Sequence, residues 1–204
     1  MKKKLVYFPE WVIVDYLSNY KGTLQTTTNI EMLGALAMIK FCERQFVSKC
    51  TIGFDIQERH ERELPNTGQI SEKDFDTLVK EKIKTDSPID FSIGKPDTKH
   101  RMDFQMKRFG KTNRQKTSQD LIDYINKLAT KYGKTGCNLV ILLESCAINP
   151  VEVSEKISIE NYPFDKIILL NQEDAKYIDY TGIWAKTGET GTSRLNLDTM
   201  TFEY

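Results

Sequence analysis

Two neighbouring segments of this chain carry the chemical groups that metal-assisted hydrolysis needs. Asp90, Gln105 and Lys107 supply a carboxylate, an amide oxygen and an ammonium group, and Met106 lies between the last two. Mg²⁺ or Mn²⁺ takes oxygen ligands, so the candidate ligand set is the Asp90 carboxylate, the Gln105 amide oxygen and the Met106 main-chain carbonyl. Such an ion stabilises charge on phosphoryl oxygens and supplies hydroxide near neutral pH. The Lys107 ammonium would orient the attacking water or help to deprotonate it.

A predicted β-hairpin positions these groups. In two runs within residues 89–107, apolar residues alternate with polar ones at the period of two expected of half-buried strands. Between the runs, a glycine, a proline and an aspartate give the composition of a turn. The register that pairs like with like places Asp90 opposite Gln105, and it also places Ser92 opposite Asp103. Because opposed Cβ atoms lie about 5 Å apart, Asp90 and Gln105 could contact the same ion.

A further acid would strengthen a site in which glutamine carries no charge. Residues 29–46 have helical periodicity, with Asn29 as the expected N-cap and Glu31 in the expected first turn. We therefore expect Glu31 as a catalytic or metal-binding residue. An equal alternative is that Glu31 only stabilises the helix, because a carboxylate in the first turn interacts favourably with the macrodipole.

The pattern of Asp90 followed by Gln105-Met106-Lys107 resembles the PD-(D/E)xK nuclease superfamily, most closely the branch related to Mrr-type restriction endonucleases, in which glutamine replaces the usual acid. The resemblance implies a restriction-endonuclease-like α/β fold, with a central mixed β-sheet flanked by helices on both faces. It also implies Mg²⁺- or Mn²⁺-dependent cleavage of nucleic acid, DNA rather than RNA, with Lys107 as the catalytic lysine. The same superfamily contains members that do not cut.

Two alternatives to a nuclease remain open. Asp, Gln and Lys are ordinary residues on the solvated face of a hairpin, so the pattern alone has a purely structural explanation. A catalytically degenerate module of the same fold could instead bind nucleic acid or a protein partner, as part of a defence or mobile-element complex. Cutting both strands of a duplex needs two sites, so a homodimer is a further hypothesis.

A basic segment follows the candidate lysine. Arg108, Lys111, Arg114 and Lys116 lie within ten residues that contain no acid, and we expect them to contact phosphates. A solvated loop explains the same residues equally well. The formal net charge of the whole chain is +0, which argues against a protein that coats nucleic acid broadly.

The elements after this segment complete an α/β pattern. Residues 117–132 predict an amphipathic helix, in which Gln119 and Tyr124 are similar to supporting residues of RecB-like nucleases. Residues 137–145 and 164–170 are apolar runs typical of buried strands, and a short helix is predicted at 150–159 between them. This order favours a crossover between parallel strands.

We expect one domain over residues 1–204, with a core at about 29–170 and an irregular extension at 181–204 with one or two edge strands. A strand at 3–8 and a helix at 9–20 precede the core. No apolar run reaches the roughly 20 residues of a membrane span, and residues 1–8 lack the pattern of a signal peptide, so a cytoplasmic location is expected.

Other chemistries find little support. The charged segment 57–69 contains His60 and three glutamates, but its two arginines favour a solvated loop over a metal site. With His60 and His100 as the only histidines, a histidine-rich zinc site is excluded and no catalytic triad is compelling. The four cysteines form no CxxC pair and are expected to be reduced and buried.

Overall fold

The computed structural model describes residues 3–20, 27–57, 89–95, 100–110, 116–132, 136–144, 148, 152–153, 156–157, 162–172, 177–184, 194–196, 198–199 and 201–203. The chain divides into two compact units, residues 1–103 and residues 104–204, which are described one at a time. The division falls inside one strand, β4 (Arg101–Phe109), between Asp103 and Phe104. The expectation of a single domain stays a prediction.

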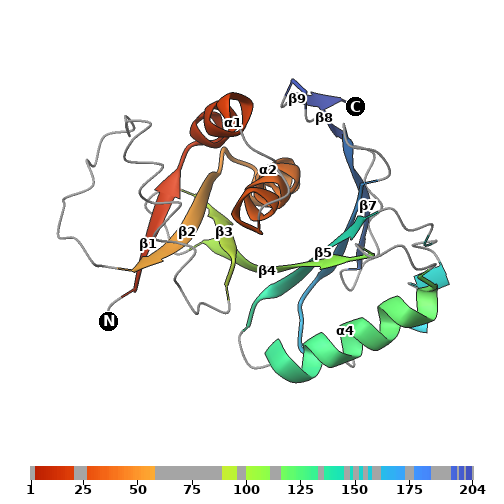
Figure 1. The fold of residues 1–204 in the computed structure, drawn as a ribbon. Helices are drawn as coiled ribbons and strands as arrows, with labels where there is room; N and C mark the ends of the chain where they lie inside the picture. Colours follow the sequence, from red (N-terminus) through yellow and green to blue (C-terminus); the bar gives the residue numbers. More distant parts are fainter. Residues whose placement is uncertain are drawn as a thin grey trace. The chain divides into compact units, whose positions relative to one another are not determined.

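Unit 1 is built on antiparallel strands (Figure 1). The strand β1 (Lys3–Phe8) pairs with β2 (Thr51–Gln57) over its whole length, from Lys3 opposite Gln57 to Phe8 opposite Ile52. The strand β2 then pairs with β3 (Phe91–Gly94). The strands β1 and β3 confirm the predicted strand at 3–8 and the first strand of the predicted hairpin to within a few residues.

Two helices of unit 1 follow β1 in the chain. They are α1 (Glu10–Asn19) and α2 (Thr27–Phe46), which agree with the helices predicted at 9–20 and 29–46. The Lys40 ammonium on α2 lies 2.9 Å from a Glu10 carboxylate oxygen on α1, so an ion pair joins the two helices. Burial lowers the pKa of Lys40, but hydrogen bonding and charge from Glu10, together with the charge of Glu43, raise it above its usual value overall.

The start of α2 corrects one sequence expectation. The helix begins at Thr27, so Asn29 lies within it, is buried, and is not the N-cap. No acidic residue lies in the first turn, so Glu31 lies deeper in the helix than predicted. Threonine is also a good residue at a helix start, and the tract of three threonines before Asn29 allows the helix to begin earlier.

Unit 2 is an α/β unit with a mixed sheet. Residues 104–109 of β4 pair in parallel with β5 (Asn138–Glu144), and β5 pairs in parallel with β6 (Ile167–Gln172). The strand β6 then pairs antiparallel with β7 (Tyr177–Trp184), with a register shift between Leu169 and Leu170. The predicted parallel crossover between β5 and β6 is confirmed.

The last strands extend this sheet in antiparallel fashion. They are β8 (Arg194–Asn196), which pairs with β7, and β9 (Thr201–Glu203), which pairs with β8. The expected extension at 181–204 therefore contains the end of β7 and two short strands among its described residues.

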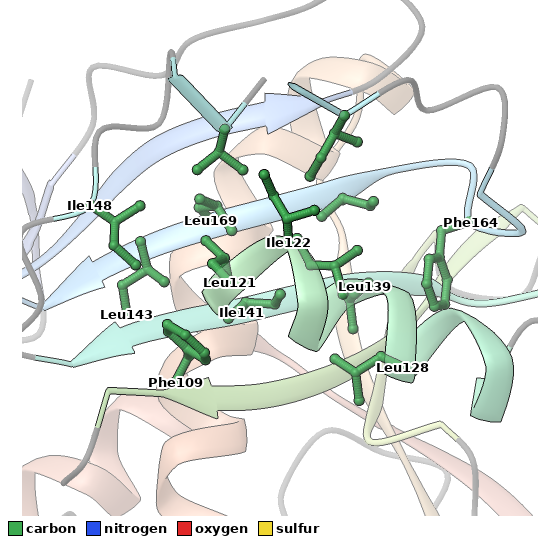
Figure 2. Close-up of a cluster of buried hydrophobic side chains, with 14 of the residues drawn as sticks. Phe109, Leu121, Ile122, Leu128, Leu139, Ile141, Leu143, Ile148, Phe164 and Leu169 are labelled. Atoms are coloured by element: carbon green, nitrogen blue, oxygen red, sulfur yellow. The ribbon is translucent and has the colours of Figure 1, made fainter. Parts of the chain in front are cut away.

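The core of unit 2 lies between its sheet and the helix α4 (Ser118–Tyr132). Figure 2 shows side chains of α4 packed against side chains of β4, β5 and β6. Residues that contribute from the helix are Leu121, Ile122, Ile125 and Leu128, and those from the strands are Phe109, Leu139, Ile141, Leu143, Ile167 and Leu169. Full burial of each such side chain is worth about 1.5 to 3 kcal/mol, so this cluster holds α4 against the sheet.

Thr117 fixes the start of α4. Its main-chain N–H donates to an Asp120 carboxylate oxygen at 2.9 Å, and its hydroxyl oxygen accepts from the Asp120 N–H at 3.2 Å. These reciprocal bonds form a capping box. The bonds that the exposed Asp120 carboxylate accepts from the Thr117 N–H and hydroxyl hold its pKa below its usual value. The predicted helix at 117–132 is thus confirmed together with its boundary.

Two further observations bear on the sequence expectations. Cys42, Cys50 and Cys137 are buried thiols, as predicted, while Cys146 lies outside the described residues. Over the part of the chain that the structure describes, no helix is long and apolar enough to cross a membrane.

Candidate functional site

The register between β3 and the start of β4 matches the predicted hairpin. The Ser92 hydroxyl donates to a carboxylate oxygen of Asp103 at 2.5 Å, so these residues oppose each other as expected. Next to the turn, the Lys95 N–H donates to the His100 carbonyl at 3.2 Å. Because the side-chain period of a strand is two, this register fixes which face each neighbouring residue occupies.

The polar side of β3 is buried, which differs from the half-buried strand that the alternation predicts. All four residues of β3 are buried, and Ser92 is only 1% exposed. The hydrogen bond to Asp103 explains how a hydroxyl tolerates this burial. Asp103 is also 3.0 Å from the Arg101 guanidinium, so its charge is balanced inside unit 1.

Asp90 and Glu31, the predicted acids, both belong to unit 1. Asp90 lies one residue before β3 and Glu31 lies on α2, and both are partly buried. Gln105, Met106 and Lys107 belong to unit 2, and each group is therefore described by itself.

Gln105 and Lys107 lie on the α4 side of the sheet in unit 2. The register pairs Gln105 with Leu139 and Lys107 with Ile141, and these two partners belong to the core beneath α4. Gln105 is 2% exposed, whereas Lys107 is partly exposed. The two predicted site residues therefore lie on the same face of the sheet. The Gln105 amide is buried there, and the Lys107 ammonium is partly exposed.

The Lys107 ammonium has two defined neighbours. It donates a hydrogen bond to the main-chain carbonyl oxygen of Met106 at 2.8 Å. It also lies 5.2 Å from the centre of the Tyr132 ring, at the end of α4, within the range of a cation–π interaction. The predicted metal-binding carbonyl and the predicted catalytic lysine are thus in contact with each other.

Arg108 lies on the opposite face from Lys107, because successive strand residues alternate. Its guanidinium makes a two-pronged ion pair with Glu144 on β5, through Nε to Oε2 at 2.8 Å and through Nη2 to Oε1. The two side chains are 19% and 11% exposed. In this structure Arg108 binds a protein carboxylate, and a phosphate would have to compete with Glu144 for it.

The other predicted basic residues are only partly described. Lys116 is partly exposed, and its ammonium lies 5.6 Å from the centre of the Phe109 ring. Lys111 and Arg114 lie outside the described residues.

The two residues expected to support the site both lie on α4. Gln119 is exposed and donates to an Asp123 carboxylate oxygen at 2.9 Å, so its contact is within the helix. The Tyr124 ring lies 5.4 Å from the Phe109 ring in a tilted arrangement. Burial, and to a smaller extent the charge of an ionised Tyr132, raise the pKa of Tyr124 above its usual value. Tyr124 therefore packs two strand positions away from Lys107.

Two contacts of the candidate residues were missed by sequence reasoning. Tyr132 was counted only as the end of an amphipathic helix, and Glu144 as part of an apolar strand. A carboxylate at the end of an otherwise apolar run, with arginine on the neighbouring strand, was the available signal for the Arg108–Glu144 pair. Nothing in the spacing of Tyr132 marked it as a partner of Lys107.

Within the described residues, no group of three or more His, Cys, Asp or Glu side chains is arranged to hold a metal ion. Comparisons of the chain with protein-family models, with curated proteins and with solved structures gave no match.

Proposed function

We propose that this protein is a metal-dependent nuclease with a restriction-endonuclease-like fold, which hydrolyses phosphodiester bonds, of DNA rather than RNA. The observation that carries the proposal is the alternation of Asp90, Gln105 and Lys107 on a hairpin. The contact between Ser92 and Asp103 supports the register that this alternation predicts. The choice of DNA rests on the resemblance alone.

The donor set fits a hard divalent cation. Asp90, Gln105 and the Met106 carbonyl offer only oxygen ligands, as Mg²⁺ or Mn²⁺ requires, and Glu31 is a further acid. A carbonyl oxygen has two lone pairs, so Met106 can accept from Lys107 and still offer one to an ion. When bound, the ion would lower the pKa of a water and offset charge on the phosphate.

The residues of the chain supply the remaining steps. The Lys107 ammonium, held by the Met106 carbonyl, would donate to the attacking water or to a phosphoryl oxygen and offset its charge. Gln105 would fix the orientation of its ligand from a buried position, which excludes bulk water on its side of the sheet. The restriction-endonuclease-like fold is part of the same proposal. It is compatible with the mixed α/β sheet of unit 2.

The burial of Gln105 favours a second candidate, a catalytically degenerate module. An amide that is 2% exposed gives little access to an ion and its waters, and Lys107 already has a hydrogen-bond partner. Such a module would bind nucleic acid or a protein partner without cutting.

A cleavage assay separates the two candidates. The purified full chain is incubated with supercoiled plasmid, single strands and branched duplexes, each with Mg²⁺ and with Mn²⁺. We expect cutting that is lost with EDTA and falls by at least 100-fold in Asp90→Ala and in Lys107→Ala, because removing one electrostatic or acid–base group costs about 10² to 10⁴ in rate. Lys127→Ala, on the exposed side of α4, is the matched control and should cut normally.

Circular dichroism of each variant confirms that it is folded. A wild-type chain that cuts none of the substrates with either metal contradicts the nuclease proposal. If it nevertheless binds them, the degenerate module is favoured.

A further inference from the structure

Lysines and aromatic rings alternate along α4 and β4 in unit 2. At one end of this row, the Tyr132 ring has two ammonium groups near it, Lys107 at 5.2 Å and Lys131 at 5.1 Å from its centre. At the other end, Lys116 lies 5.6 Å from the Phe109 ring, which itself contacts Tyr124 at 5.4 Å. We call these six residues the lysine–aromatic row.

The two ends of the row are connected. Tyr124 and Tyr132 both lie on α4, the helix that follows β4. They are eight positions apart on one helix, which corresponds to about 12 Å along its axis. On the strand, Lys107 and Phe109 are neighbours on the same face, about 7 Å apart.

Most of the row is accessible. Lys131 is exposed, while Lys107, Lys116, Tyr124 and Tyr132 are partly exposed, and only Phe109 is buried. A ligand could therefore reach the ammonium groups and the exposed parts of both tyrosine rings, which otherwise pack against the core of unit 2.

We propose that the lysine–aromatic row binds single-stranded nucleic acid, with phosphates at the lysines and bases against Tyr124 and Tyr132. Grooves that bind single strands combine positive charge along the backbone with aromatic rings on which bases stack. Backbone phosphates are negative and repeat every few ångströms, so several can contact a row of this length. In a duplex the base faces are covered by neighbouring bases, so the rings favour an unpaired strand.

This inference rests on the proposed function, because Lys107 belongs both to the row and to the candidate catalytic set. It adds that the bound strand is unpaired, which neither the resemblance nor the hairpin provides. It also adds Lys131 and Tyr132 as binding residues that lie outside the predicted basic segment.

A binding assay without metal tests the row separately from cleavage. The full chain in EDTA is titrated into a fluorescently labelled oligothymidylate of about 20 nucleotides, which exceeds the roughly 4 to 16 nucleotides that one single-strand-binding fold covers. The fluorescence anisotropy is followed at several salt concentrations, and an oligouridylate and a duplex of equal length are run in parallel. We expect both single strands to bind more tightly than the duplex.

The key variant is Lys131→Gln, and Lys49→Gln, at an exposed lysine of unit 1, is its control. Both changes remove one exposed positive charge, but only Lys131 lies against an aromatic ring among the described contacts. Loss of one phosphate contact should reduce the salt slope by about 0.7, which corresponds to about fivefold weaker binding at 0.1 M salt relative to 1 M. We expect this change in Lys131→Gln and not in Lys49→Gln.

The ring is tested with Tyr132→Leu and Tyr132→Phe. Stacking of one base is worth about 1 to 3 kcal/mol, so Tyr132→Leu should weaken binding about 5- to 100-fold, while Tyr132→Phe should bind like wild type. Circular dichroism checks that the variants are folded, and the exposed Lys131 variant remains informative if Tyr132→Leu does not fold.

Three outcomes would each overturn the proposal that the row binds single strands. They are equal effects of Lys131→Gln and Lys49→Gln, tighter binding of the duplex than of the single strands, and no binding by the wild type. These outcomes are distinct from failure of the proposed nuclease. Single-strand binding without cleavage under Mg²⁺ or Mn²⁺ would support the proposed binding site and refute the proposed nuclease activity. Cleavage without this pattern of binding would support the nuclease activity and refute the binding site.

Discussion

The backbone conformation at the C-terminal end of α2 predicts that replacing Val47 with glycine will stabilise unit 1. The helix ends at Phe46, and the next residue, Val47, has a φ of 51°. The Val47 N–H donates to the Arg44 carbonyl at 3.4 Å and the Ser48 N–H donates to the Glu43 carbonyl at 3.2 Å. These two bonds define a Schellman motif, in which the left-handed position is usually glycine.

The magnitude follows from three contributions. The left-handed conformation costs an L-residue about 1 to 2 kcal/mol, and a β-branched side chain is especially unfavourable there. Val47 is 89% exposed, so Val47→Gly gives up almost no burial. Glycine loses about 0.5 to 1 kcal/mol more backbone entropy on folding than alanine does. We therefore expect Val47→Gly to stabilise unit 1 by about 0.5 to 1 kcal/mol.

Urea unfolding followed by circular dichroism measures this change. With a slope of about 1 to 3 kcal/mol per molar urea, the midpoint should rise by about 0.2 to 1 M. Hydrogen exchange of the amides of α2 assigns the gain to this unit. Val47→Ala is the control, because it retains the Cβ atom and removes only the branching, so it should raise the midpoint less than Val47→Gly does. A midpoint that stays level or falls in Val47→Gly would refute the argument from backbone strain.

Three further outcomes are expected. A Cβ atom on Gly94 would lie 2.7 Å from the His100 carbonyl oxygen, so Gly94→Ala should destabilise the chain by about 1 to 3 kcal/mol in urea unfolding, and an unchanged midpoint would contradict this contact. Glu144→Gln leaves Arg108 without its charged partner and should lower the free energy of unfolding by about 2 to 3 kcal/mol. In a double-mutant cycle, replacing both residues by apolar ones should recover most of this loss, and equal losses in the single and double variants would argue against the ion pair. The raised pKa of Tyr124 means that its contribution to stability is present below about pH 10 and is lost as the pH rises through the raised pKa. Tyr124→Phe should therefore make the loss of stability at alkaline pH less steep. The same slope in the variant and the wild type would show that the phenol ionises as freely in the folded chain as in the unfolded one.

Local patterns predicted the secondary structure well. The amphipathic stripe of α4 and the apolar run of β5 appear in the structure within one residue of their predicted limits. The hairpin register was also recovered, because a shift by one residue would reverse the faces of both strands. These features depend on periodicities that are written directly in the sequence.

The surroundings of the candidate site could not be predicted in the same way. Alternation shows which face Gln105 and Lys107 occupy, but not that α4 covers this face and brings Tyr132 to the ammonium. The same limit applies to Ser92, which the pattern places on a solvated face and the structure buries. Burial of a polar residue depends on what packs over the strand, which is a property of the tertiary structure.

The parallel pairing of β4 with β5 has a consequence for how unit 2 forms. Parallel neighbours cannot be joined by a tight turn, so the chain must pass through α4 before the first hydrogen bond between these strands can close. The entropy of closing this loop is lost before any hydrogen bond between the two strands forms, so parallel sheets of this kind nucleate slowly. During protein synthesis, residues 104–109 of β4 therefore cannot pair with β5 until α4 and β5 have also emerged from the ribosome.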